Sequence, residues 1–154
     1  MWADPLPSAM TSQPTDFLKT ARKAADAAAA VHKTHAASVG ISDVREKGRA
    51  DYVSATDIAA QEACVTIIRE NHPDHTIVAE ESHEGDESGI PSEGPAWIVD
   101  PLDGTINFLH GVPHFAISIA LEERAEITAG VIYEPVRDEL FWAEKGAGAY
   151  LNRR

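Results

Sequence analysis

The chain has 154 residues, of which 44% are apolar and 25% are charged, and this length and composition are typical of one folded domain rather than of a disordered chain. Its formal net charge is −12, from 13 basic and 25 acidic residues. A surface this acidic repels phosphate backbones and anionic lipids, so we expect neither nucleic acid nor a membrane surface as a partner. The single cysteine excludes an internal disulfide and any metal site built from several cysteines, and it suits a cytoplasmic location.

The first residues differ in composition from the rest of the chain. Residues 1–14 contain three prolines and have neither a basic region nor an apolar region of the kind that a secretory signal needs. We therefore expect a flexible leader over residues 1–14, followed by one α+β domain over residues 15–154.

Two helices are expected next. The alanine-rich residues 15–38 predict the first helix, with Asp16 as a candidate N-cap. The second helix is expected to begin at Thr56 or Asp57, because apolar residues from Ala60 onward recur every three or four positions. The polar residues between the two helices predict a loop that leads into a short extended segment.

The remainder of the chain is expected to form strands. Short apolar or alternating segments bounded by turn residues predict strands over residues 76–80, 96–100, 115–121, 127–133 and 139–143, and a last one at Tyr150. The later strands are joined by short links, which favour antiparallel pairing. Helices followed by a run of strands indicate an α+β fold in which a helical pair packs on a largely antiparallel sheet.

The segment with the clearest chemical meaning is WIVDPLDGTINF, at residues 97–108. An apolar strand delivers Asp100 at its carboxyl end, and Asp103 can turn back toward the same point. Gly104 permits a close backbone approach, and Thr105 suits the N-cap of a short helix. Two carboxylates and a backbone carbonyl around one point form the oxygen-rich site that Mg²⁺ prefers, and the N–H groups at a helix start favour an anion.

Two further acids are candidates for the same site. Glu80 ends a predicted strand, from which its carboxylate can reach the rim of the sheet, and Asp57 stands at the start of the second helix. A plainer interpretation of each remains open at this stage. Asp-Pro and Asp-Gly pairs are common in solvated turns, the acids near Glu80 can form an exposed loop, and Asp57 can cap its helix.

Three blocks together resemble the inositol monophosphatase family: DYVSATD at residues 51–57, AEES at 79–82 and WIVDPLDGTINF at 97–108. The resemblance extends from about Phe17 to the end of the chain. The family contains magnesium-dependent phosphomonoesterases of inositol phosphates, and related enzymes act on fructose 1,6-bisphosphate, histidinol phosphate or nucleotide 3′-phosphates. The resemblance implies a layered αβαβα fold, of which this chain would supply the first half.

The resemblance also implies roles for individual residues. The implied metal ligands are Glu80, Asp100, Asp103 and the carbonyl of Leu102. The implied phosphate-binding residues are Asp103, Gly104 and Thr105. Asp57 is expected to accept a hydrogen bond from the Thr105 hydroxyl, and Glu80 and Thr105 to orient the attacking water. The resulting hypothesis is hydrolysis of a small-molecule phosphate ester, inositol monophosphate or a related sugar phosphate, by a water that Mg²⁺ activates.

One departure from the family pattern leaves alternatives open. Family members carry a further metal-binding aspartate in a Trp-Asp-x-x-Ala-Gly pattern, and this sequence contains no Trp-Asp dipeptide. The alternatives are a truncated module without catalytic activity and a relative that acts on one of the other phosphate esters. A sheet without its second half would expose apolar side chains, so we also expect self-association, with a homodimer as one possible assembly.

Overall fold

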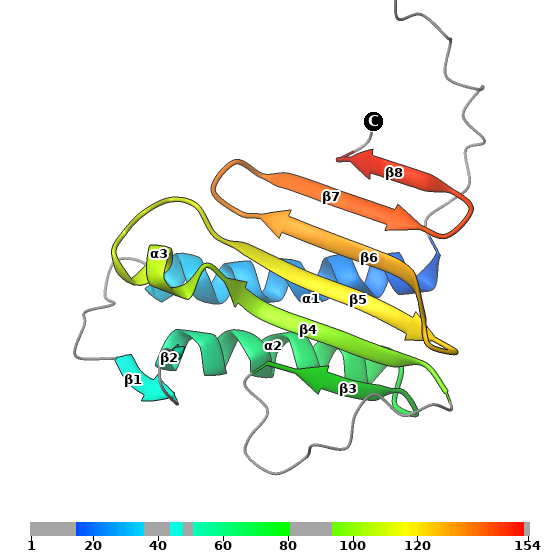
Figure 1. Cartoon of the computed structure of the whole chain (residues 1–154), viewed down its shortest axis with the longest axis horizontal. Helices are drawn as coiled ribbons and strands as arrows, with labels where there is room; N and C mark the ends of the chain where they lie inside the picture. Colours follow the sequence, from blue (N-terminus) through cyan, green and yellow to red (C-terminus); the bar gives the residue numbers. More distant parts are fainter. Residues whose placement is uncertain (1–14, 36–43, 48–50, 81–93, 153–154) are drawn as a thin grey trace, which may run out of the picture.

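The computed structural model describes residues 15–35, 44–47, 51–80 and 94–152. In this part of the chain, α1 (Asp16–His35) and α2 (Ala55–Asn71) lie side by side on one face of a six-stranded sheet (Figure 1). The predicted α+β class, with a helical pair on a largely antiparallel sheet, is confirmed. The leader expected over residues 1–14 lies outside the described residues.

The sheet follows the chain from one edge to the other. Its strands are β3 (Thr76–Ala79), β4 (Ala96–Asp103), β5 (Ala116–Glu123), β6 (Glu126–Glu134), β7 (Glu139–Glu144) and β8 (Gly148–Leu151), in that spatial order. The β3–β4 pair is parallel and the other pairs are antiparallel. Ile117, Ile119 and Leu121 of β5 are buried against the helices, which explains why the alternating pattern predicts this strand correctly.

Two details of the strands differ from the prediction. The segment expected to be a loop and a short extended piece forms an antiparallel pair, β1 (Val44–Lys47) and β2 (Asp51–Ser54). Strand β4 continues to Asp103 although Pro101 stands within it, and the pairing with β5 changes register between Asp100 and Asp103. Proline removes a backbone donor, so the irregularity in the ladder falls where proline stands.

The start of α1 corrects the predicted cap. The Oγ1 atom of Thr15 accepts a hydrogen bond from the backbone N–H of Leu18 at 3.5 Å, and the helix begins at Asp16. Asp16 instead lies in the first turn, where its carboxylate contacts the Lys19 ammonium at 3.0 Å. The cap is therefore Thr15, and the acid supports the helix through its position near the positive end of the helix dipole.

The interface between α1 and α2 is built from small side chains. Ala24, Ala25 and Ala28 of α1 and Ala60 and Cys64 of α2 have no solvent exposure. The Cys64 thiol donates a hydrogen bond to the Ala24 carbonyl at 3.3 Å, and burial raises the pKa of this thiol to about 12. The cysteine is thus a packing residue in its reduced form. No helix in the described ranges is long and apolar enough to cross a membrane.

The second face of the sheet carries exposed apolar side chains. Strand pairing places Ile132, Phe141 and Leu151 next to one another on β6, β7 and β8, and these side chains are 49%, 43% and 38% exposed. A neighbouring row consists of small residues, in which Ala120, Gly130 and Ala143 are paired across β5, β6 and β7. A contiguous apolar surface of this kind favours association in water.

We therefore expect the isolated chain to self-associate through this face. Replacing Ile132 by threonine keeps a β-branched side chain but adds a hydroxyl, so it should lower the weight-average mass in sedimentation at a given concentration. The matched control is Val112→Thr, because Val112 is similarly exposed (45%) but lies in the loop that follows α3 (Thr105–Leu109). A monomeric unchanged chain, or equal effects of both substitutions, would contradict this expectation.

Candidate metal and phosphate site

The parallel pairing of β3 and β4 brings two acids together at one end of the sheet. Ala79 is paired with Val99, and the next residue along each strand is Glu80 and Asp100, respectively. The backbone N–H of Glu80 donates to the Val99 carbonyl at 3.1 Å, which extends the ladder to this point. The two side chains lie close enough to interact, because both the charge of Glu80 and hydrogen bonding with it raise the pKa of Asp100.

The electrostatics of Asp100 follow from this arrangement. Partial burial raises its pKa to about 7, and the charge of Glu80, the hydrogen bond to Glu80 and the charge of Asp103 act in the same direction. The backbone N–H of Leu102 donates to Asp100 Oδ1 at 3.0 Å and opposes the shift. The fold thus holds two acids where two negative charges repel each other, and a divalent cation would relieve this repulsion.

The turn after Asp100 positions the other predicted residues. Leu102 is buried, at 2% exposure, and its carbonyl accepts a hydrogen bond from the Thr105 hydroxyl at 3.0 Å. The hydrogen bond between the Thr105 hydroxyl and the Asp57 carboxylate that the resemblance implies stays a prediction. Asp57 is buried, at 1% exposure, in the first turn of α2.

The backbone conformation at residue 104 explains why a glycine stands there. Its φ of 92° and ψ of 33° lie in the left-handed region, and it occupies the N-cap position of α3. A Cβ atom at this position would stand 3.1 Å from the His114 carbonyl oxygen. Thr105 is the first residue of α3 and Gly104 is its N-cap, so the prediction that Thr105 caps this helix is wrong. The chain must approach His114 closely here, and a side chain would prevent it.

The donor set suits Mg²⁺ better than a soft metal. Glu80 and Asp100 adjoin each other, the Leu102 carbonyl lies on the same turn, and the exposed Asp103 is near enough to raise the pKa of Asp100. Within the described residues, no three side chains of His, Cys, Asp or Glu converge on one point as metal ligands. Mg²⁺ commonly takes one or two carboxylates and completes its shell with water, so a carboxylate pair with a carbonyl fits this ion.

The structure therefore brings part of the predicted metal and phosphate ligands together. Glu80 and Asp100 interact, Leu102 and Asp103 end β4, and Gly104 and Thr105 begin α3 directly after it. The direct ligation of a metal, the contact of Gly104 and Thr105 with phosphate, and the pairing of Asp57 with Thr105 remain predictions. The parallel register of β3 with β4 is the feature that the sequence pattern did not indicate, although Glu80 and Asp100 each end an apolar strand.

Comparison with known proteins shows the family to which the chain belongs. The family model for the inositol monophosphatase family matches residues 13–154. The chain is 47% identical over 108 residues to a protein of Pasteurella multocida named Nus factor SuhB, and the match covers 69% of this chain and 39% of that protein. It is 48% identical over 108 residues to an inositol-1-monophosphatase of Rhizobium meliloti, over 70% of this chain and 40% of the relative.

Solved structures agree with these matches. The extragenic suppressor protein SuhB of Bartonella henselae has a TM-score of 0.80 and 41% identity, over 91% of this chain and 53% of that one. An IMPase of Thermotoga maritima has a TM-score of 0.78 and 36% identity, over 91% of this chain and 52% of that one. The chain thus spans about half the length of these relatives. On both the sequence and the fold, it belongs to the inositol monophosphatase family.

Proposed function

We propose that the chain carries the metal-binding and phosphate-binding part of a magnesium-dependent phosphomonoesterase that hydrolyses inositol monophosphate or a related sugar phosphate. The single observation that carries the proposal is the contact between Glu80 and Asp100 at the end of a parallel strand pair, next to the turn that begins α3. Family membership and the name of the Rhizobium meliloti relative support the reaction class.

The residues have separable roles in this proposal. Bound Mg²⁺ would lower the pKa of a water molecule and neutralise charge on the phosphoryl oxygens. Glu80 and Asp100 would hold the ion together with the Leu102 carbonyl and Asp103. Gly104 and Thr105 would present backbone N–H groups to the phosphate, and no side chain at Gly104 would obstruct that approach. Glu80 would accept a hydrogen bond from the attacking water and thereby orient it.

Positioning and charge account for most of the catalysis of phosphoryl transfer, and this chain's residues supply both in the proposal. The partners proposed are therefore small phosphate esters rather than nucleic acid or membranes, consistent with a net charge of −12. We also propose a cytoplasmic setting, which the single reduced cysteine supports.

The experiment is an assay of inorganic phosphate release by the purified chain, with and without millimolar Mg²⁺. The substrates are myo-inositol 1-phosphate, fructose 1,6-bisphosphate, histidinol phosphate and adenosine 3′-phosphate. Release that depends on Mg²⁺ and is fastest with the inositol ester is the expected result. A preference for another ester would keep the reaction class and change the substrate, and the absence of Mg²⁺-dependent release from all four would reject activity for this chain.

A second candidate is a module without catalytic activity. It is favoured by the name Nus factor SuhB that several relatives carry, because this name does not describe a phosphatase. This candidate and the phosphatase differ in one result. A module of this kind would bind Mg²⁺ at Glu80 and Asp100 without releasing phosphate from any of the four esters.

A further inference from the structure

The loop between α3 and β5 returns to the turn from which α3 begins. Residues 110–115 connect these two elements, and Asp103 at the end of β4 is paired with Ala116 at the start of β5. The His114 carbonyl oxygen lies so near Gly104 that a Cβ atom there would stand 3.1 Å from it. The loop therefore packs directly against the turn that carries the proposed phosphate ligands.

Asn107 of α3 holds this loop with both its side chain and its backbone. Its side-chain Nδ2 donates a hydrogen bond to the His114 carbonyl at 2.8 Å. Its backbone carbonyl accepts one from the Val112 N–H at 2.8 Å, and the His114 N–H donates to the Val112 carbonyl at 2.8 Å. The bond from Nδ2 depends on the residue type, whereas the other two use backbone groups that almost every residue supplies.

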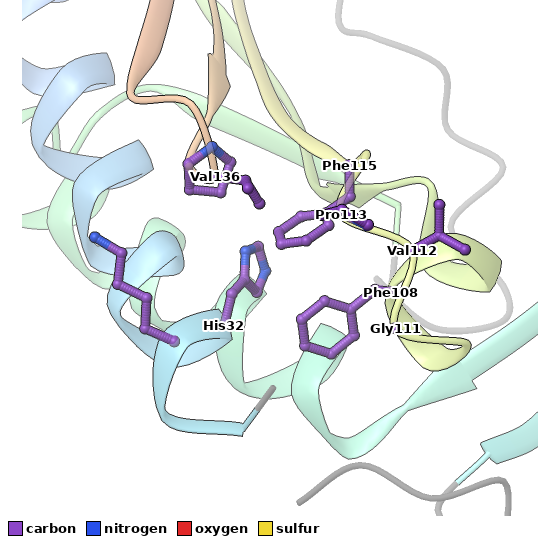
Figure 2. A pocket seen from close by; sticks show the side chains of 9 residues that line it. His32, Phe108, Gly111, Val112, Pro113, Phe115 and Val136 are labelled. Atoms are coloured by element: carbon purple, nitrogen blue, oxygen red, sulfur yellow. The ribbon is translucent and has the colours of Figure 1, made fainter. Parts of the chain in front are cut away.

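An aromatic contact holds the end of the loop. The rings of Phe108 and Phe115 meet edge to face at a centroid distance of 5.1 Å (Figure 2). Phe108 is buried, so this contact attaches the loop to the interior of the chain. The bond from Asn107 Nδ2 is exposed to solvent and reaches the residue before Phe115, whose carbonyl meets Gly104. Ring packing therefore keeps the loop in place, and Asn107 sets the position of the carbonyl that Gly104 approaches.

We propose that Asn107 is a positioning residue for phosphate binding, an inference that rests on the proposed function. Its amide holds the His114 carbonyl against Gly104, and this contact limits the room in which Gly104 can leave its left-handed conformation. The direction of the N–H groups that Gly104 and Thr105 would present to the phosphate is thereby fixed. Donors that are already fixed bind a ligand more tightly, because they need not be ordered on binding. Asn107 acts through the loop and does not itself contact the phosphate in this proposal.

The test replaces Asn107 by alanine, which removes the side-chain amide and keeps a residue that favours helices. The matched control is Asn71→Ala at the end of α2. Asn71 Nδ2 also donates a solvent-exposed hydrogen bond of 2.8 Å to a backbone carbonyl, that of Ile67. The two variants therefore lose the same kind of bond, one beside the Gly104 turn and one in α2.

Titration calorimetry with inorganic phosphate, in saturating Mg²⁺, measures the effect on binding. We expect Asn107→Ala to bind phosphate about five-fold more weakly than the unchanged chain, the effect of one neutral hydrogen bond, and to bind Mg²⁺ equally well. Asn71→Ala should match the unchanged chain in both affinities, and Asn107→Gln, which keeps the amide donor, should bind phosphate more tightly than Asn107→Ala. A merely structural role would lower the melting temperature of Asn107→Ala without this selective loss. Equal phosphate affinities of the unchanged chain and Asn107→Ala, or no phosphate binding by the unchanged chain, would overturn the proposal.

Amide hydrogen exchange without Mg²⁺ or phosphate tests the positioning step by itself. The His114 amide should exchange about five-fold faster in Asn107→Ala than in the unchanged chain, and at the unchanged rate in Asn71→Ala. Equal exchange at His114 in all three chains would overturn the proposal whatever the chain catalyses. A chain that releases no phosphate from the esters, but binds phosphate more weakly as Asn107→Ala, would reject the proposed activity and support this inference. Mg²⁺-dependent release and phosphate binding that Asn107→Ala leaves unchanged would support the activity and overturn the inference.

Discussion

In magnesium-free buffer at pH 8, the Asp100→Asn chain is expected to melt at a higher temperature than the unchanged chain. The half-buried Asp100 carboxyl adjoins Glu80, and its pKa is raised from 3.8 to about 7. Between these two values the folded chain keeps a proton that the unfolded chain has lost, so the contribution of Asp100 to stability falls as the pH rises through this window. Asparagine removes the charge and can still donate a hydrogen bond to Glu80.

Scanning calorimetry at pH 5 and pH 8 measures this effect. The advantage of Asp100→Asn is expected to be smaller at pH 5, where the folded chain holds most of the proton. Asp26→Asn is the matched control, because the Asp26 carboxylate is 55% exposed and pairs at 3.8 Å with Arg22, a surface contact of little energetic weight. A melting temperature of Asp100→Asn at or below that of the unchanged chain at pH 8 would show that the carboxyl pair is not strained.

Replacing Glu80 by glutamine is expected to reduce Mg²⁺-dependent phosphate release by about a hundred-fold or more, as is typical when a residue that orients a reacting proton is lost. Glutamine keeps the size of the side chain but cannot supply a negative charge to the ion or accept a proton from water. Since the Glu80 side chain is exposed, the substitution should leave the melting temperature without Mg²⁺ the same or higher.

The control for Glu80→Gln is Glu70→Gln, an exposed position near the end of α2. It makes the same chemical change away from the end of β3 and β4, and its rate of phosphate release should match that of the unchanged chain. Equal rates for the unchanged chain and Glu80→Gln would remove Glu80 from the catalytic residues. Equal losses of phosphate release in both variants would show that the net charge of the chain, rather than the position of Glu80, sets the rate.

The sheet was predictable because its strands carry strong patterns. The alternation of Ile117, Ile119 and Leu121 reports one buried face, and short turns between later strands favour antiparallel neighbours. The pair β1 and β2 was missed because the four residues Val44–Lys47 carry no alternation of apolar side chains. The cap of α1 was misplaced by one residue, since Thr15 and Asp16 are both good capping residues and only the backbone geometry distinguishes them.

The residues of the candidate site could be predicted from the sequence, but the contacts between them could not. The acids at strand ends could be recognised along the chain, whereas the contact between Glu80 and Asp100 depends on the parallel register of two strands. The hydrogen bond of the Thr105 hydroxyl to the Leu102 carbonyl depends on the conformation of one turn. The hollow that His32, Phe108 and Val136 line could not be foreseen, because these residues are far apart in the sequence and meet only in the folded chain (Figure 2).

The most direct test of the central claim is a calorimetric titration of the chain with Mg²⁺ at pH 6 and pH 8, in buffers that differ in ionisation enthalpy. We expect saturable binding that is tighter at pH 8, with release of protons at pH 6, because the ion must displace the proton that Asp100 holds below its raised pKa of about 7. We also expect Glu80→Gln and Asp100→Asn each to weaken this binding strongly. The absence of saturable binding, or binding that both substitutions leave unchanged, would contradict the assignment of a metal site to this carboxyl pair.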